Sequence, residues 1–364
     1  MYLSEFSCSS FRNLSNIKLS LSKDINIIYG SNAAGKSSFL EAVCYLVSGR
    51  SFRTAKQNLL ISHEFTNFTL FGLFSNNTKL GVSYSQSTKS KRIRLDQQTI
   101  KSLSLVAGLY PVQVLSPESY HLIDSGPLER RKYIDWLLFH VEHSYQINWT
   151  RFHRLLKQRN SYLRKADSFP NDDEFLLWDL EYETSAEIIN KYRSGIVELL
   201  EPNLIDVLNI IGFESTKDLK ISYYSGYTGK LSDRLRDSRN QDLTSGNTLY
   251  GPHKAELRIK IGKHLAKDVL SRGQKKLLVN ALYLAQTKIL KQVTQKDSLF
   301  IIDDFSSELD ECNQALLIDT LRAQDNVQII LSCLHPDMIK PFIKEYNGAT
   351  MFHVEQGIIE KVLN

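Results

Sequence analysis

Hydrophobic and polar positions alternate like strands at both ends of the chain and follow helical spacing in its middle. Short apolar or alternating runs predict strands over residues 2–8, 17–21 and 25–29. Residues 36–47 have helical spacing, and residues 68–100 return to strand-like alternation. This mixture predicts an α/β fold.

The middle of the chain predicts an antiparallel pair of helices. Helical spacing runs from residue 128 to about 165 and resumes from 172 to about 211, after a break at 167–171. Pro202 is expected to end or kink the second helix. Strands are then expected at 219–224, 257–261, 299–302, 327–331 and 351–354, with helices at 273–293 and 310–322. We therefore expect three segments, with boundaries at 1–125, 126–216 and 217–364.

Composition fits a globular protein of the reducing cytoplasm. Of the 364 residues, 42% are hydrophobic and 23% are charged, which is ordinary for such a protein. The N-terminus carries no export signal, and no apolar run approaches the ~18 residues that cross a membrane. The four cysteines form no Cys-x-x-Cys pair, which argues against a zinc site or a disulfide framework. The net charge of +5 permits a polyanionic partner without requiring one.

A phosphate-binding loop follows the strand at 25–29. The pattern Gly-x-x-x-x-Gly-Lys-Ser is formed by Gly30, Ser31, Asn32, Ala33, Ala34, Gly35, Lys36 and Ser37. Backbone amides of such a loop bind the phosphates of ATP, the lysine supplies a point charge, and the serine is a ligand of Mg²⁺. The strand before the loop and the helix after it are the context that the motif requires.

A second part of the same site is expected near the other end of the chain. Asp303 and Asp304 follow the apolar strand at 299–302. A carboxylate at the end of a buried strand can hold Mg²⁺, so Asp303 is the expected metal ligand together with Ser37.

Two further motifs resemble those of ATP-binding-cassette (ABC) ATPases. Ser271, Arg272, Gly273 and Gln274 precede the helix at 273–293 and resemble the signature motif. The segment Ser306-Ser307-Glu308-Leu309-Asp310 resembles the D-loop. The resemblance implies that the signature residues bind the γ-phosphate of ATP held by another subunit, so that an ATP-dependent homodimer forms two composite sites.

More specific segments resemble the RecF-like and SMC-like branch of these ATPases. Phe11-Arg12-Asn13 resembles the segment that places an arginine near the nucleotide, which makes Arg12 and Asn13 expected ATP-binding residues. Segments at 110–118, 126–135, 155–160 and 250–254 resemble RecF-like recombination mediators. The resemblance implies an ABC-type head with an inserted helical arm, and a cytoplasmic protein that binds single-stranded, gapped or duplex DNA in an ATP-dependent way. It also implies a role in replication, repair and the SOS response, with RecO and RecR helping to load RecA.

Three residues are expected to act in hydrolysis. Asp304 stands where ABC ATPases usually have a glutamate, and its shorter side chain predicts a weak, DNA-dependent ATPase that serves as a switch. Gln113 is the expected Q-loop glutamine, although a solvent-facing glutamine at a strand end is the alternative. His335 is the candidate switch histidine, or else an ordinary loop residue.

Two basic segments are candidate DNA surfaces. Residues 126–165 carry nine Lys and Arg against three acids, but residues 166–216 carry two against twelve, so the second helix of the arm is expected to neutralise the first. The better candidate is a β-hairpin with Lys89, Lys91, Arg92, Arg94 and Lys101. Phosphate contact there would weaken steeply with salt, and a solvated basic hairpin is the alternative.

Three other functions compete with this hypothesis. An ABC transporter subunit would have its two ATP motifs closer together, and an SMC-like DNA-bridging protein would need a much longer coiled coil. A small nucleotide kinase would have no use for the signature residues. The arm of about 80 residues and the Phe-Arg-Asn segment favour the RecF-like alternative.

Overall fold

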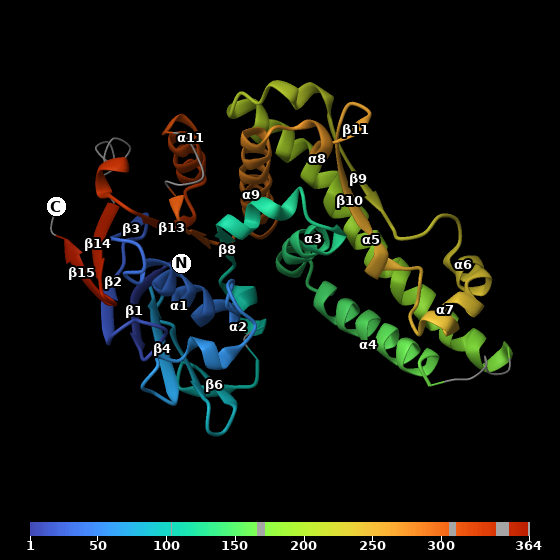
Figure 1. Cartoon of the computed structure of the whole chain (residues 1–364), viewed down its shortest axis with the longest axis horizontal. Helices are drawn as coiled ribbons and strands as arrows, with labels where there is room; N and C mark the ends of the chain where they lie inside the picture. Colours follow the sequence, from blue (N-terminus) through green and yellow to red (C-terminus); the bar gives the residue numbers. More distant parts are fainter. Residues whose placement is uncertain (103, 166–171, 306–310, 340–348, 363–364) are drawn as a thin grey trace. The chain divides into compact units, whose positions relative to one another are not determined.

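The chain forms two compact units, one of which contains both ends of the sequence. The computed structural model describes residues 1–364 except 103, 166–171, 306–310, 340–348 and 363–364. Unit 1 comprises Met1–Tyr120 and Lys276–Asn364, and unit 2 comprises His121–Lys275. In Figure 1 the blue N-terminal and red C-terminal segments lie side by side within unit 1.

Unit 1 contains an antiparallel sheet and a mixed sheet. The antiparallel sheet has the strand order β2-β1-β4-β5-β6-β7. Its strands are β1 (Leu3–Ser9), β2 (Ile17–Ser20), β4 (Asn67–Phe74), β5 (Lys79–Ser85), β6 (Ser90–Leu95) and β7 (Gln98–Ile100). The mixed sheet has the order β15-β14-β3-β13-β12-β8. Its strands are β3 (Ile25–Tyr29), β8 (Val112–Leu115), β12 (Ser298–Ile302), β13 (Val327–Cys333), β14 (Ala349–Glu355) and β15 (Ile358–Val362).

Helix α1 (Lys36–Ser48) contacts both sheets and joins them into one core. Ten of its residues are buried, and Phe39 packs edge-on against Phe6 of β1 with ring centroids 5.3 Å apart. Unit 1 also contains all or part of three further helices: α2 (Ser104–Leu109), α9 (Arg272–Thr294) and α11 (Glu311–Arg322). The boundary between the units falls within α9.

Unit 2 is built on helices with a small sheet. Its helices are α3 (Pro127–Val141), α4 (Tyr145–Leu163), α5 (Asp172–Ile210), α6 (Leu231–Asp237), α7 (Arg239–Ser245) and α8 (Ala266–Val269). Strands β9 (Leu219–Tyr224), β10 (Glu256–Ile261) and β11 (His264–Leu265) pair in the order β11-β10-β9. Figure 1 shows α4 alongside α5, with which it packs.

The structure differs from several of the expected elements. The helix expected over 128–165 is divided into α3 and α4 at Glu142. Pro202 lies inside α5 without ending it. Residues 217–275, expected in the C-terminal lobe of the head, belong to unit 2 because β9 packs on α5 and β10 packs on α3.

Buried ion pairs and a hydrogen bond connect residues 242–252, which precede β10, to helices α4 and α5 of unit 2. Arg159 on α4 is 1% exposed and binds Asp179 and Asp242, at 3.1 Å and 2.7 Å. Arg193 on α5 binds Asp135 at 2.8 Å and donates to the Pro252 carbonyl. The aromatic residues of the predicted basic arm are partly core, since Tyr133 and Phe152 are buried.

Candidate nucleotide-binding site

The phosphate loop lies between β3 and α1, as the motif predicts. β3 ends at Tyr29 and α1 begins at Lys36, so the loop is the six residues between them. Gly30 has φ +154°, and a Cβ added there would lie 2.2 Å from the Val354 carbonyl oxygen of β14. Only glycine fits this position, because both the backbone conformation and the neighbouring strand exclude a side chain.

The ammonium group of Lys36 contacts the first two residues of the phosphate loop. Its Nζ donates to the carbonyl oxygens of Gly30 and Ser31, at 2.8 Å and 2.9 Å. Burial lowers the pKa of Lys36, and the nearby charges of Asp304 and Asp303 oppose that shift. The lysine therefore lies close to both predicted acids.

Asp303 and Ser37 meet at the carboxyl end of the mixed sheet. Ser37 Oγ donates to Asp303 Oδ1 at 2.8 Å, and Ser332 Oγ donates to the same oxygen at 2.9 Å. Asp303 is 9% exposed. Burial raises the pKa of its carboxyl group, and the two serine hydrogen bonds oppose the shift. The hydroxyl and carboxylate oxygens are ligands that suit Mg²⁺, so Ser37 and Asp303 fit the predicted metal.

Ser332 also anchors Asp304. The Asp304 amide donates to Ser332 Oγ at 2.9 Å, and Asp304 has φ +57°. A left-handed conformation is uncommon for a residue other than glycine and is sustained by its surroundings. Ser332 was not predicted from the sequence, where its signal is a polar residue between Leu331 and Cys333 in β13.

Arg12 and Asn13 have different roles beside the loop. Asn13 Nδ2 donates to the Ala33 carbonyl at 3.2 Å, so this residue contacts the phosphate loop directly. Arg12 instead makes a two-pronged ion pair with Glu41 of α1, at 2.8 Å and 2.9 Å. Glu41 is fully buried and also accepts a hydrogen bond from Ser51. Sequence analysis missed Glu41, although an acid between Leu40 and Ala42 in an apolar helix was a usable signal.

A cavity of about 510 Å³ borders this corner of unit 1. Its lining combines polar and apolar groups, among them Arg12, Asn13, Ser38, Leu59, His63 and Phe65. Asn13 links it to the phosphate loop.

Gln113 is buried within β8, which excludes the alternative of a solvent-facing glutamine at a strand end, and its role as the Q-loop glutamine stays a prediction. It lies within β8 opposite Phe300 of β12 and is 3% exposed. Its carboxamide donates to Gln286 at 2.9 Å and accepts from Thr287, both on α9. The structure thus gives Gln113 a role in packing α9 on the sheet. His335 is exposed and follows the end of β13, where its role stays a prediction.

The signature residues form an exposed start of α9. Ser271, Arg272 and Gly273 are exposed. The Ser271 amide donates to Gln274 Oε1 at 2.9 Å, and the Gln274 amide donates to Ser271 Oγ at 3.3 Å. This reciprocal capping leaves the motif at the N-terminus of a 23-residue helix. The D-loop segment 306–310 lies outside the described residues.

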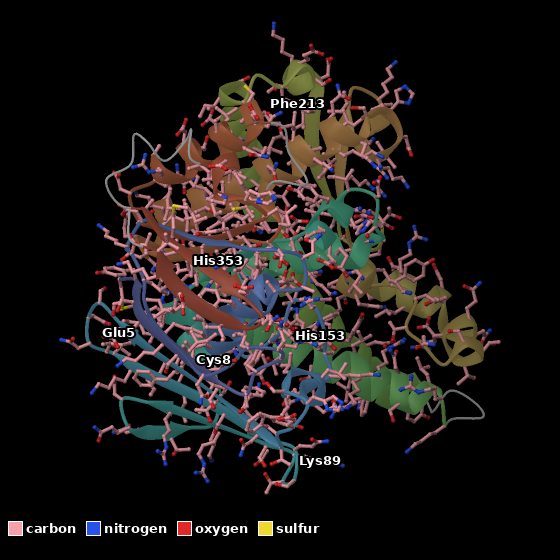
Figure 2. All side chains as sticks on the ribbon, turned by 60° about the vertical axis from the view of Figure 1, so that its left-hand side comes forward. Glu5, Cys8, Lys89, His153, Phe213 and His353 are labelled. Atoms are coloured by element: carbon pink, nitrogen blue, oxygen red, sulfur yellow. The ribbon has the colours of Figure 1, made fainter. Side chains whose placement is uncertain are left out.

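The basic hairpin is formed by β5 and β6, whereas Lys101, which was predicted to lie on it, follows β7. One of the cations on β6 also differs from the rest. Figure 2 shows Lys89 at the turn between these strands. Lys89, Arg92, Arg94 and Lys101 are exposed. Lys91 points to the opposite face, where its Nζ donates to the Gly49 carbonyl at 2.9 Å and lies 4.9 Å from the Tyr45 ring centroid. We therefore remove Lys91 from the candidate DNA contacts.

Acids of α5 do pair with the basic helix of the arm. Arg151 binds Glu181 at 3.0 Å, and Arg159 is buried against Asp179. Because these acids pair with two of its cations, the segment 126–165 does not form one continuous cationic surface.

The fold and site define an ABC-type ATPase head of the RecF and SMC group. Residues 2–360 match the family described as the RecF/RecN/SMC N terminal domain. An Smc head bound to the C-winged helix domain of ScpA superposes with a TM-score of 0.59 at 15% identity, over 100% of this chain and 97% of that one. At this identity the likeness concerns the fold alone. No helix in the described part of the chain is both long enough and apolar enough to cross a bilayer.

Relatives with higher sequence identity are RecF proteins. The "DNA replication and repair protein RecF" of Shewanella baltica (strain OS223) is 38% identical over 363 residues, with 98% of each chain covered. That of Shewanella frigidimarina (strain NCIMB 400) is 36% identical over 364 residues, with 99% of each covered. A solved recombination mediator RecF bound to ATP has a TM-score of 0.86 at 27% identity, covering 100% of this chain and 98% of that one. The chain belongs to the RecF family of DNA replication and repair proteins.

Proposed function

We propose that this protein binds ATP with Mg²⁺ and uses the bound nucleotide to control its binding to DNA. The observation that carries the proposal is the hydrogen bond of 2.8 Å between Ser37 and Asp303, beside Lys36. It brings together a phosphate loop and an acid that are 266 residues apart. Ser37 and Asp303 would hold Mg²⁺, which would neutralise charge on the phosphates. The solved RecF that contains ATP supports the same assignment.

The protein acts, in this proposal, as an ATP-dependent homodimer. Support comes from Ser271 and Gly273, which expose the N-terminus of a long helix to solvent. Backbone amides at such a terminus attract phosphate. In the dimer each signature motif would complete the site of the other subunit, as the family resemblance implies.

The dimer would bind single-stranded gaps and duplex junctions and, with RecR and RecO, help to load RecA. The four exposed cations Lys89, Arg92, Arg94 and Lys101 are the proposed phosphate contacts. Slow hydrolysis would set the lifetime of the complex, since Asp304 is shorter than a glutamate and its backbone is held by Ser332. The relatives named in the RecFOR pathway support this part of the proposal.

Mixing two inactive variants tests the composite sites. Lys36→Ala removes the charge within the loop, and Ser271→Arg blocks the signature motif. Each variant alone is expected to lack DNA-stimulated ATPase activity. An equal mixture should recover about a quarter of the wild-type rate, because half of the dimers are mixed and each keeps one of two sites.

The outcomes separate a dimer from a monomeric ATPase. Sedimentation with ATP and Mg²⁺ should show dimers of the wild-type chain at the same concentrations. Absence of recovery in the mixture, with wild-type dimers present, would contradict sites shared between subunits.

A further inference from the structure

The C-terminal hairpin lies directly on the phosphate loop. β14 pairs in parallel with β3, and His353 lies opposite Tyr29, the last residue before the loop. At the turn between β14 and β15, the Gly357 amide donates to the Ala34 carbonyl at 2.8 Å. The Gly357 carbonyl accepts from the Ser15 amide at 3.0 Å. One residue of this turn therefore contacts both the phosphate loop and the segment after Asn13.

Asn13 contacts the loop from another side. Its Nδ2 donates to the Ala33 carbonyl, and its Oδ1 accepts from Ser38 Oγ on α1 at 2.7 Å. Together, Asn13 and Gly357 bind two successive carbonyls of the loop. In a trans peptide unit the N–H points opposite to the C=O. The hydrogen bond to the Ala34 carbonyl therefore turns the Gly35 amide away from the hairpin, and loop amides of this kind bind phosphate.

Gly357 fits closely against Asn13. It has φ +81°, and a Cβ added there would lie 1.8 Å from the Asn13 carbonyl oxygen and 2.9 Å from its carbon. Both atoms belong to the backbone and cannot rotate away as a side chain could. Any larger residue must therefore displace the turn, the Asn13 segment or both.

We propose that the β14–β15 turn positions the phosphate loop, with Gly357 and Asn13 as positioning residues for nucleotide binding. The proposal rests on the ATP binding proposed above and adds that the last strands of the chain set the orientation of loop carbonyls. Nucleotide binding and the packing of the hairpin are then linked: each strengthens the other.

A matched pair of glycine variants tests the proposal. Gly357→Ala is expected to weaken ADP binding about tenfold or more, because small displacements of a preorganised site are costly. Gly262→Ala is the control: Gly262 lies in the β10–β11 turn with φ +59°, and nothing lies within 4 Å of an added Cβ. It should change ADP affinity by less than about twofold, since it does not contact the site.

Two measurements separate a loss of nucleotide affinity from a loss of folding. Fluorescence titration with a labelled ADP reports affinity, and thermal unfolding without nucleotide reports the fold. Loss of affinity in Gly357→Ala with a folded nucleotide-free protein supports a positioning role. Wild-type affinity in that variant would overturn it. Failure of the wild-type chain to bind ADP would instead contradict the proposed function.

Hydrogen exchange of the wild-type chain covers the case in which Gly357→Ala does not fold. Because the Gly357 amide is bonded to the phosphate loop, ADP should slow exchange in residues 356–359. Exchange around Gly262 should stay unchanged. Equal exchange with and without ADP at the C-terminal turn, under conditions where ADP binds, would refute the link.

Discussion

Charge reversal on one face of β6 should weaken DNA binding in a way that salt dependence can measure. Arg92 and Arg94 are exposed and lie on the same face of the strand, with the buried Ile93 between them. Their cross-strand neighbours on β5 are Ser83 and Gly81. These small residues leave both guanidinium groups uncovered. The double variant Arg92→Glu/Arg94→Glu therefore removes two candidate phosphate contacts while keeping the pleat of the strand.

The size of the effect follows from counterion release. Each phosphate contact contributes about 0.9 to the slope of log K against log salt for duplex DNA. Losing two contacts should lower the magnitude of that slope by about 1.8. From about 50 to about 200 mM salt, the wild-type affinity should then fall roughly tenfold more than that of the variant. At the lowest salt the variant should also bind more weakly, since two repulsive charges have been added.

Fluorescence anisotropy with a labelled gapped duplex, in ATP and Mg²⁺, measures the slope. Lys220→Glu/Arg258→Glu is the matched control, because it makes the same change in charge at exposed positions of β9 and β10. Lys91→Met is a second control: it should lower stability by removing a hydrogen bond at the end of α1, while DNA affinity stays the same. An unchanged slope in the Arg92/Arg94 variant would refute this surface. An equal loss in the Lys220/Arg258 variant would show that net charge, and not this face, controls binding.

Two predictions concern the nucleotide site. Burial raises the pKa of Asp303, so its stabilising contribution is complete below the unfolded pKa of about 4 and is lost as pH rises toward the folded pKa. Without nucleotide, Asp303→Asn should therefore raise the free energy of unfolding at pH 7–8 and lose this advantage near pH 4. The same variant should abolish stabilisation by MgATP. Thermal unfolding across pH checks both effects, and a variant less stable than the wild type at pH 8 would contradict the reasoning. Glu41→Gln should lower the free energy of unfolding by about 3 kcal/mol, because it leaves Arg12 without its buried partner. Urea unfolding measures the loss, with the exposed Glu198→Gln as a control expected to stay within about 0.5 kcal/mol, and equal midpoints for the two variants would refute the reasoning.

The sequence predicted which residues meet at the proposed nucleotide site better than it predicted the groups that hold them in place. The phosphate loop could be predicted because its glycines, Lys36 and Ser37 are contiguous and the flanking strand and helix are strongly patterned. Asp303 could be predicted because a fully apolar strand precedes it. Their supports could not be predicted in the same way. Ser332 and Glu41 are polar residues directly flanked by apolar ones, and their partners are visible only once the chain is folded.

Errors in the sequence analysis came from side-chain direction more than from element type. The alternative for Gln113 was a solvent-facing residue at a strand end, but Gln113 lies opposite Phe300 within the sheet, and its carboxamide binds α9. Lys91 was grouped with its basic neighbours, but the pleat turns it toward α1. β15 was missed because five residues, of which four are exposed, carry little hydrophobic pattern. For Gln113 and Lys91, a partner distant in sequence decided the outcome.

The missed hairpin shows why such errors matter most near a functional site. The motif defines which residues can bind a phosphate, but loop carbonyls and amides must also point in the right directions. Gly357 and Asn13 provide two of those constraints, and they lie outside the motif on opposite ends of the chain. Since the Ala34 carbonyl accepts a hydrogen bond from the C-terminal turn, we expect a substitution hundreds of residues from the motif to alter nucleotide affinity without changing any proposed ligand. Sequence motifs in this family therefore identify the chemistry, and the long-range contacts determine whether the loop is shaped to perform it.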